Sequence, residues 1–350
     1  MRKLKIGVIG AGGIARRKVI PAIQQSRNCE VVAVMNPSKS QEIAAQFGVS
    51  NAYASEADLL ADPDVAAVYV ASPVNVHATQ VIAAARAGKH ILCEKPFTLT
   101  LEEADRAIAA CDEAHVVLQE GYMMKFHGAH QAIKKLIANG SVGKLVYMRA
   151  QLSCWYPAIT GAWRQDPKLG GGGALYDMAT HLYDLLEFFA GPIKRLGCFT
   201  RSHVQGYASE DLATTLLEFD NGAQATVDVS FCVPDEAAKT RLEVYGSEGS
   251  LLAEGTIGQS SGGTLEGVLN RRTGGYDAAQ NKDVPRTFQP ISFEQVNPYT
   301  AQFEYFADCV MNRRAPEINN GVNARHIVDL AQKAYAASRE SRIISLERTA

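Results

Sequence analysis

The sequence predicts an α/β domain with a doubly wound parallel sheet, followed by an α+β domain whose sheet is mostly antiparallel. Up to about residue 122, short apolar runs alternate with segments of helical spacing. Uninterrupted apolar strands are typical of a parallel sheet that helices cover on both sides. Beyond that residue the strands are longer, have a mixed pattern and follow one another through turn signals. We therefore expect two domains, at residues 1–122 and 123–350.

The predicted elements of the first domain alternate in type. Strands are expected at residues 4–9, 31–35, 65–71, 90–93 and 116–119. A glycine-rich turn and a helical stretch follow the first strand, and later helices are expected at residues 40–47, 79–87 and 101–114. Connections between parallel strands are right-handed crossovers by strong precedent.

The second domain begins with a predicted helix at residues 129–138 and ends with an amphipathic helix at about residues 324–338. Asp220-Asn221-Gly222 predicts a β-hairpin, and the Gly/Ser-rich stretch 255–264 predicts a mobile surface loop. Strands are expected between the two helices, at residues 145–153, 194–204, 212–219, 223–232, 240–246 and 250–253.

The composition argues against several classes of function. The chain has 350 residues, of which 35 are basic and 37 acidic, for a net charge of −2. This balance gives no electrostatic reason to expect nucleic acid or an anionic membrane as a partner. The seven cysteines are scattered, as in a protein with reduced thiols and no metal site. A signal-peptide region is lacking, and no apolar run approaches the about 18 residues that span a bilayer, so we expect a cytoplasmic protein.

A dinucleotide fingerprint follows the first predicted strand. Gly10-Ala11-Gly12-Gly13-Ile14-Ala15 reads G-x-G-x-x-A and opens a helix. The first glycine permits a tight turn, the second lets the main chain approach a pyrophosphate, and the small third residue lets the helix pack on its strand. Gly10, Gly12, Gly13 and Ile14 are therefore predicted to bind a dinucleotide. The alternative is a glycine-rich turn in a domain that has lost its nucleotide.

The end of the second strand bears on the choice between NAD and NADP. NAD-binding domains carry a carboxylate here that holds the ribose 2′-hydroxyl, whereas this chain has Asn36. Asn36 does not repel a 2′-phosphate, and Ser38 and Lys39 could bind one, which favours NADP over NAD. In the alternative, Asn36 caps a turn and Lys39 is a solvated lysine at the start of a helix.

Two further segments carry candidate catalytic groups. Glu94-Lys95-Pro96 follows the fourth strand at the edge of the sheet where open α/β proteins bind ligands. A glycine run at residues 170–173 leads into a helix on which Asp177 and His181 are four residues apart and therefore neighbours. This pair is either a histidine proton donor supported by a carboxylate or part of a solvated polar face that also includes Asp184.

These residues resemble those of the glucose-fructose oxidoreductase/inositol dehydrogenase/rhizopine catabolism (Gfo/Idh/MocA) family. The resemblance extends over nearly the whole chain, and the Ala-Gly-Lys-His…Glu-Lys-Pro block is its most specific part. The shared signals are the opening fingerprint, Ser72-Pro73-Val74-Asn75-Val76-His77, Ala87-Gly88-Lys89-His90-Ile91-Leu92-Cys93-Glu94-Lys95-Pro96, and Gly171-Gly172-Gly173 leading to Asp177 and His181.

The resemblance implies a Rossmann domain followed by an open, largely antiparallel sheet that often mediates dimer or tetramer formation. Family members typically oxidise or reduce a secondary carbinol of a sugar, inositol or sugar nucleotide with a nicotinamide cofactor and no metal. In this chain Lys95 would orient the substrate hydroxyl, and His181 would act as general acid and base. Asp177 would position the substrate and tune that histidine.

Further site residues follow from the same resemblance. Trp163 and Arg164 match a family pair near the nicotinamide and the substrate; the alternative is an interface tryptophan beside a surface arginine. The other expected cofactor residues are Ser72, Pro73, Asn75, His77, Glu94, Lys95 and Pro96. The expected substrate residues are Lys95, Tyr122, Lys125, His127, Trp163, Asp177 and His181.

The chain departs from the family pattern at two places. Lys125-Phe126-His127-Gly128 stands where relatives commonly have Arg-Phe-x-Pro, so the charge is kept but the bidentate contacts of arginine are not. His127 could face the substrate, although a lone histidine is more often structural. Ala179 replaces the glycine of the family's D-x-G-x-H pattern, with no expected effect.

The sequence thus predicts an NAD(P)(H)-linked dehydrogenase or reductase of a sugar-like substrate, active as a homodimer or homotetramer through the C-terminal sheet. One rival is a glycosidase that uses bound NAD for a transient oxidation, as some relatives of the family do. Another is a sensor that binds dinucleotide and sugar to control a partner protein. The set of Lys95, Asp177 and His181 argues against a sensor, because a sensor needs no proton donor.

Overall fold

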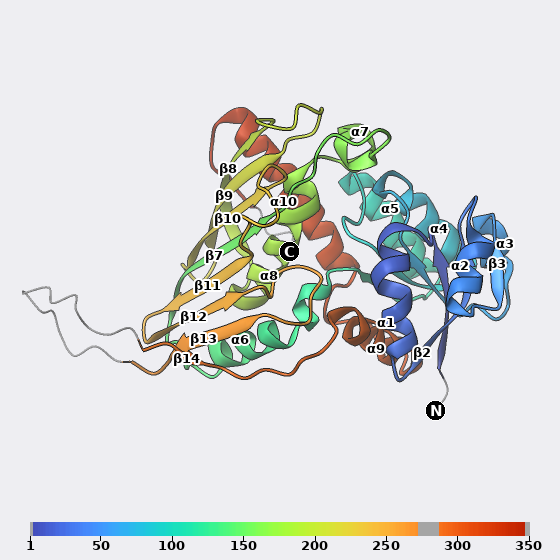
Figure 1. The fold of residues 1–350 in the computed structure, drawn as a ribbon, viewed down its shortest axis with the longest axis horizontal. Helices are drawn as coiled ribbons and strands as arrows, with labels where there is room; N and C mark the ends of the chain where they lie inside the picture. The colour runs from blue at the N-terminus through green and yellow to red at the C-terminus, as the bar shows by residue number, and fades with distance from the viewer. Residues whose placement is uncertain (1–2, 272–286, 347–350) are drawn as a thin grey trace, which may run out of the picture.

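The computed structural model describes residues 3–271 and 287–346, which contain two sheets with their helices (Figure 1). The N-terminal sheet has six parallel strands in the order β3-β2-β1-β4-β5-β6, which confirms the predicted doubly wound fold. The order reverses between β1 and β4, and such sheets bind ligands beyond the carboxyl ends of their strands at that point. The strands are β1 (Leu4–Ile9), β2 (Cys29–Met35), β3 (Asn51–Tyr53), β4 (Ala67–Val70), β5 (His90–Cys93) and β6 (Leu118–Glu120).

The helices of this domain connect its strands. A π-helical turn, Ala15–Val19, directly precedes α1. The sequence pattern does not predict β3 and α3, because elements of three and six residues are too short to establish a period. The helices are α1 (Ile20–Gln25), α2 (Ser40–Phe47), α3 (Glu56–Ala61), α4 (His77–Arg86) and α5 (Leu101–Glu113).

The C-terminal sheet has nine strands in the order β14-β13-β12-β11-β7-β10-β9-β8-β15. It is antiparallel except where β7 lies parallel to β10, so the mostly antiparallel sheet is confirmed, as is the hairpin between β9 and β10. The strands are β7 (Leu145–Ser153), β8 (Ile193–Arg201), β9 (Leu212–Phe219), β10 (Gln224–Ser230), β11 (Arg241–Gly246), β12 (Gly249–Glu254), β13 (Thr264–Val268), β14 (Gln289–Pro290) and β15 (Ile344–Ser345).

Helices cover one face of the C-terminal sheet and leave the other exposed. α6 (Gly128–Ala138), α8 (Thr180–Ala190) and α10 (Gly321–Glu340) all lie on the same side (Figure 1). The side chains of β9 alternate accordingly, since Thr215 and Leu217 are buried while Leu216 is 57% exposed. We call the uncovered side the open face. Phe199, which is 77% exposed, lies on it beside Thr214.

Two helices near the C-terminus return to the N-terminal domain. α9 (Pro298–Met311) packs against α1 and β2, and α10 packs against α5 and β6. Ala324 and Val328 of α10 belong to the same buried cluster as Ala104 and Leu118 of the N-terminal domain. The two domains are therefore joined by packing as well as by the chain. Within the described residues, no helix is both long enough and apolar enough to cross a membrane.

Candidate active site

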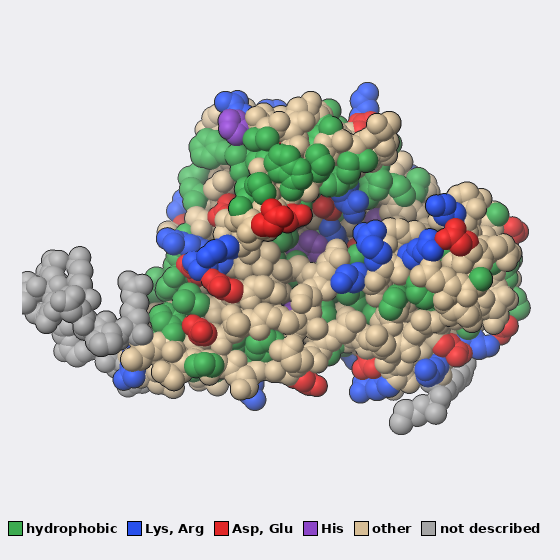
Figure 2. Space-filling view, in the orientation of Figure 1, with side chains coloured by type: hydrophobic (Ala, Val, Ile, Leu, Met, Phe, Trp, Pro, Cys, Tyr) green, Lys and Arg blue, Asp and Glu red, His purple; other side chains and the backbone are tan. Residues whose placement is uncertain are grey.

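A cleft of about 860 Å³ lies where the two domains meet. Gly10, Asn36 and Ser72, which follow β1, β2 and β4, line it from the N-terminal domain. Asp177 and His181 line it from the C-terminal domain. Figure 2 shows acidic, basic and histidine side chains gathered at this junction. The cleft therefore occupies the switch point of the parallel sheet, where a ligand is expected.

The glycine turn after β1 presents its main chain to the cleft. Gly10 has a φ of 74°, and a Cβ there would lie 2.6 Å from Ser72 Oγ, so only glycine fits. A Cβ on Gly12 would come within 3.6 Å of Asn36 Nδ2, and one on Gly13 would have none of the described residues within 4 Å. Gly12, Gly13 and Ile14 line the cleft at the start of a helix. Main-chain N–H groups in this position bind phosphate, so the turn fits a dinucleotide pyrophosphate.

Asn36 shapes the turn after β2. Its Oδ1 accepts the main-chain N–H of Ser38 at 3.1 Å and that of Lys39 at 3.0 Å, as in the turn-capping alternative. Asn36 and Pro37 line the cleft, whereas Ser38 and Lys39 are exposed just beyond it. Capping occupies the carbonyl oxygen of Asn36 and leaves its amide nitrogen on the side of Gly12.

Lys95, Arg164 and Asp177 form a charged cluster inside the cleft. Lys95 Nζ donates to Asp177 Oδ1 at 2.8 Å and to the main-chain oxygen of Asp177 at 2.8 Å. Arg164 Nε donates to the same Oδ1 at 3.1 Å, and its guanidinium lies 4.1 Å from the centre of the Trp163 ring. Burial alone would raise the pKa of Asp177, but Lys95 and Arg164 outweigh burial and hold it well below its usual value. Arg164 is therefore part of the cluster, and the alternative of a plain surface arginine is wrong.

His181 lies one helical turn after Asp177 and also lines the cleft. The pKa of His181 is well below its usual value because the ring is buried and faces the ammonium group of Lys95, although Asp177 opposes the shift. Nδ1 of His181 is buried and has no hydrogen-bond partner within residues 3–271 and 287–346. The ring is therefore neutral, and Nε2 is the nitrogen left to face a substrate. Tyr122 packs edge-on against this ring, with the ring centres 5.3 Å apart.

The alternative of a solvated polar face on this helix is wrong. Asp177 lies in a π-helical turn, Leu175–Ala179, that begins α8, and His181 and Asp184 lie on α8 itself. His181 is 7% exposed and Asp184 is 2% exposed. Both sides of the helix are buried, because its apolar side packs into the main core while Tyr122 packs against His181 and Lys125 pairs with Asp184 on the other side.

Some of the expected cofactor residues line the cleft, and others lie outside its lining. Ser72, Pro73 and Glu94 line it, but Asn75, His77 and Pro96 do not. His77 is buried, and its ring joins the carbonyl oxygen of Ser72, at 2.8 Å, to that of Pro96, at 3.0 Å. His77 thus ties the loop after β4 to the loop after β5. Tyr69 donates a hydrogen bond to Glu94, and burial raises the pKa of that carboxyl.

Lys125 and His127 lie outside the cleft lining, contrary to the substrate contacts predicted for them. Lys125 is 6% exposed, and its Nζ lies 2.6 Å from Asp184 Oδ1 and 2.9 Å from Asn319 Oδ1. The ammonium group therefore neutralises a buried carboxylate. Tyr122 is likewise buried and reaches the cleft only through its contact with His181.

The segment predicted as a surface loop reaches into the cleft. Gly258 and Gln259 line the cleft. His127 Nε2 lies 3.1 Å from the carbonyl oxygen of Gly262, and His130 Nε2 lies 3.1 Å from Thr256 Oγ1. Both histidines are buried, so His127 serves to anchor this loop.

Sequence reasoning missed several residues of the cleft lining. Arg17 follows the fingerprint, and its position in the first turn of that helix was a usable signal. Nothing in the pattern identified the others, because their side chains reach the cleft only through the packing of segments that are distant in the sequence. They include Cys154, Tyr156, Gln259 and Tyr299. Within the described residues, His, Cys, Asp and Glu form no group of three that could hold a metal ion.

The comparisons with known proteins agree with this geometry. Residues 4–122 match the family model described as an oxidoreductase family with an NAD-binding Rossmann fold, and residues 130–252 match the GFO/IDH/MocA C-terminal domain. The 1,5-anhydro-D-fructose reductase of Ensifer adhaerens is 35% identical over 266 residues, which cover 74% of this chain and 78% of the relative. The D-xylose 1-dehydrogenase (NADP(+)) 2 of Haloferax volcanii is 29% identical, with 90% and 92% covered.

A solved structure shares the complete fold. The aldose-aldose oxidoreductase of Caulobacter crescentus, in complex with glycerol, superposes with a TM-score of 0.87 at 24% identity. The match covers 99% of this chain and 100% of that one. Together with the cleft and its charged cluster, these matches show an NAD(P)-dependent oxidoreductase that acts on CH–OH groups. The chain belongs to the Gfo/Idh/MocA family of oxidoreductases.

Proposed function

We propose that this enzyme transfers a hydride between NAD(P) and a secondary hydroxyl or keto group of a sugar, an inositol or a related polyol. The observation that carries the proposal is the position of Lys95, Asp177 and His181 in the cleft that also exposes the glycine turn. A charged donor, a carboxylate and a neutral histidine beside a dinucleotide site are the groups that reversible alcohol oxidation requires.

The roles of the side chains follow from their contacts. The nicotinamide, when bound, supplies hydride acceptance and donation. Gly10, Gly12, Gly13 and Ile14 hold the pyrophosphate, and Ser72, Pro73 and Glu94 border the rest of the cofactor site.

The proton is handled by this chain's own groups. Lys95 donates a hydrogen bond to the reacting oxygen, and its ion pair with Asp177, at 2.8 Å, holds the ammonium group in place. His181 takes the hydroxyl proton at Nε2 during oxidation and returns it during reduction, which its neutral ring permits. Trp163 and Arg164 border the same space, and Arg164 limits the movement of Asp177.

NADP is the preferred cofactor in this proposal. The turn at Asn36 carries no negative charge toward the position of the adenosine ribose, while Lys39 is exposed and free to reach a 2′-phosphate. The similarity to a relative whose name specifies NADP(+) supports this preference.

The decisive experiment is a matrix of cofactors and substrates. Purified enzyme is incubated with NAD, NADP and their reduced forms against polyols, aldoses, ketosugars and sugar nucleotides, with nicotinamide absorbance as the readout. Turnover with NAD or with NADP supports the proposal and identifies the cofactor that the enzyme uses. Cofactor binding by fluorescence quenching without turnover on any substrate would instead favour the glycosidase or the sensor.

We further propose that the open face joins copies of this chain into a dimer or tetramer. The face carries Phe199 and Leu216, both largely exposed, between polar residues such as Thr214. Apolar side chains on an uncovered sheet are typical of interfaces between protein chains. We also place the division of the chain at residues 122 and 123, just after β6, and the enzyme in the reducing cytoplasm, since its seven cysteines are unpaired.

A further inference from the structure

The glycine run 170–173 precedes the helix that carries Asp177 and His181, which we call the catalytic helix. The run packs closely against other segments of the chain, and we call this contact region the joint. A Cβ on Gly170 would lie 3.0 Å from the Arg164 Cα, and Gly171 has a φ of 78°. A Cβ on Gly172 would overlap the Tyr335 hydroxyl, and one on Gly173 would overlap the carbonyl oxygen of Glu210. All three contacts are with other segments of the chain. The run therefore brings the main chain of the catalytic helix against the loop before β9 and against α10.

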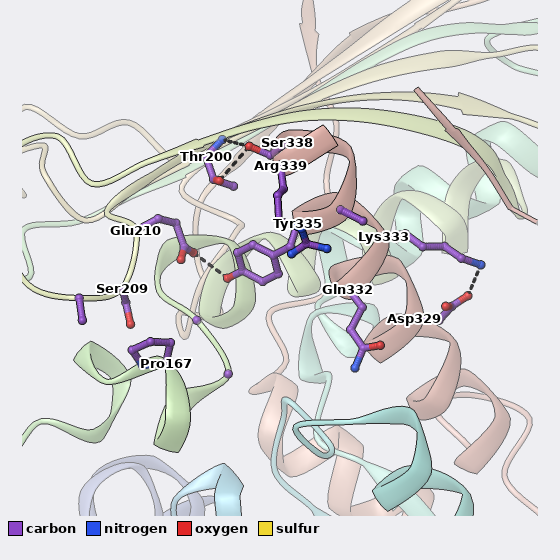
Figure 3. A pocket seen from close by; sticks show the side chains of 14 residues that line it. Pro167, Thr200, Ser209, Glu210, Asp329, Gln332, Lys333, Tyr335, Ser338 and Arg339 are labelled. Atoms are coloured by element: carbon purple, nitrogen blue, oxygen red, sulfur yellow. Dashed lines mark hydrogen bonds and ion pairs between the residues drawn. The ribbon is translucent and has the colours of Figure 1, made fainter. Parts of the chain in front are cut away.

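Glu210 is the centre of this joint. Its Oε1 accepts the N–H of Gly173 at 2.9 Å, the N–H of Leu175 at 2.9 Å and the hydroxyl of Tyr335 at 2.8 Å. Its main-chain oxygen accepts the N–H of Ala174 at 3.0 Å. Figure 3 shows the carboxylate of Glu210 pointing at the Tyr335 hydroxyl from across the joint. One residue thus bonds three successive N–H groups that the start of a helix leaves without partners.

The joint connects directly to the charged cluster of the active site. Asp177 N–H donates to the carbonyl oxygen of Gly173 at 2.9 Å, so Asp177 is one hydrogen bond from a residue that Glu210 holds. At the other end of the run, Gly170 packs directly against the main chain of Arg164. Arg164 is the second side chain that bonds Asp177. A shift of the joint therefore moves Asp177 relative to Lys95.

We propose that Glu210, supported by Tyr335, is a positioning residue that sets the depth of the catalytic helix in the cleft. Glu210 touches neither the cleft nor the cluster, and it acts through Gly173 and Leu175. This inference rests on the proposed function for its kinetic test, but its structural test is independent of any substrate.

Water can replace the carboxylate, which makes the role testable without unfolding. Glu210 and Tyr335 line a cavity of about 760 Å³ (Figure 3), which shares no lining residue with the cleft. If the side chain is removed, water from this cavity can satisfy the N–H groups of Gly173 and Leu175 but cannot fix their position. The helix then keeps its hydrogen bonds and loses its fixed depth.

The test compares three substitutions. Glu210→Ala is expected to lower kcat by about 10- to 100-fold, the effect of a displacement of about 1 Å at a reacting group. Cofactor affinity, measured by fluorescence quenching, should stay unchanged because the glycine turn after β1 is remote. Glu210→Gln keeps an oxygen for all three donors and should retain kcat within about threefold, because weaker neutral hydrogen bonds still fix where the donors lie.

The matched control is Asp329→Asn. Asp329 lines the same cavity and pairs with Lys333 at 2.7 Å, so this variant should keep full activity. If Glu210→Ala keeps kcat within twofold, or loses activity only in proportion to its unfolded fraction, the positioning role is overturned.

A crystal structure of Glu210→Ala separates the two proposals. The distance from Lys95 Nζ to Asp177 Oδ1, 2.8 Å here, should increase in the variant. An unchanged distance overturns the positioning role. Failure of the native enzyme on every substrate, with an increased distance in the variant, would overturn the proposed function and leave the positioning role standing.

Discussion

Lys95 Nζ lies 2.8 Å from Asp177 Oδ1, although 82 residues separate the two in the chain. The contact joins the loop after β5 of the parallel sheet to the helix that packs on the antiparallel sheet. This contact therefore links the two domains at the place where a substrate would bind.

Replacing Lys95 should abolish most of the activity. Lys95→Ala removes the donor to the reacting oxygen, and we expect kcat to fall by about 100- to 1,000-fold, as for the loss of an oxyanion donor. Steady-state kinetics in both directions measure this, and Lys144→Ala, at an exposed lysine, is the control. Near-normal turnover of folded Lys95→Ala would show that the proposed mechanism is wrong.

The pH dependence of oxidation should report the low pKa of His181. Its pKa lies well below 6.5, so the neutral ring that accepts a proton persists as the pH falls through 6.5. We expect kcat/KM for alcohol oxidation to stay level through that value and to decline only at lower pH. His181→Asn should remove this decline together with most of the rate. A decline centred above pH 6.5 in the native enzyme would contradict the neutral histidine.

Asn36 should control the preference for NADP. Asn36→Asp places a carboxylate that repels a 2′-phosphate and accepts a hydrogen bond from a 2′-hydroxyl. The ratio of kcat/KM for NADP to that for NAD should then fall by at least about tenfold, or about 1.4 kcal/mol. Lys39→Ala should weaken NADP binding and leave NAD binding unchanged. If neither variant alters the ratio, the phosphate-site argument fails.

Lys125 should matter for stability and little for substrate binding. Asp184→Asn leaves the buried ammonium group without its anion, and we expect a loss of about 3–5 kcal/mol in the free energy of unfolding. Urea denaturation measures the loss. Lys125→Arg, with Asp184 present, keeps a cation beside the carboxylate, so it should lose less stability than Asp184→Asn and keep the substrate KM. An increase in KM with unchanged stability would support the substrate role that the sequence suggests.

The open face should be necessary for assembly. Leu216→Glu buries a charge in any interface formed there, so the dissociation constant should rise by at least about tenfold. Sedimentation of the native and variant proteins gives the oligomeric state. Val322→Glu is a matched control, because Val322 is 73% exposed but lies on α10. A native monomer, or an oligomer that tolerates Leu216→Glu, would contradict the proposal.

The sequence was sufficient for the elements with a sustained pattern and for the residues in strong local motifs, whereas α9 and β13 were not predicted. β1, β5, β7, β9 and α2 have the predicted limits: β1 and β5 are sustained apolar runs, α2 is closed by Gly48, and the Asp220-Asn221-Gly222 turn marks the end of β9. Lys95, Asp177 and His181 were identified from motifs that place them at a sheet edge and on one side of a helix. Their common place in the cleft agrees with those motifs.

What the sequence could not provide were the effects of distant segments. Nothing near Lys125 indicates that Asn319 and Asp184 surround its ammonium group. The helical wheel of α8 gives one polar side, but on that side Tyr122 covers His181 and Lys125 covers Asp184. Gln259 reaches the cleft because two histidines far from it in the sequence hold its loop.

The return of α10 to the first domain has a consequence for biosynthesis. Ala324 and Val328 fill part of the core beside Ala104 and Leu118, yet the ribosome adds them only after strands β7 to β14 of the second sheet. Domains near the N-terminus usually fold first during translation, but this one stays incomplete until α10 has been made. A nascent chain that stalls before α10 therefore exposes apolar surface on a sheet whose strands are all present, and chaperones have a reason to hold it until α10 emerges.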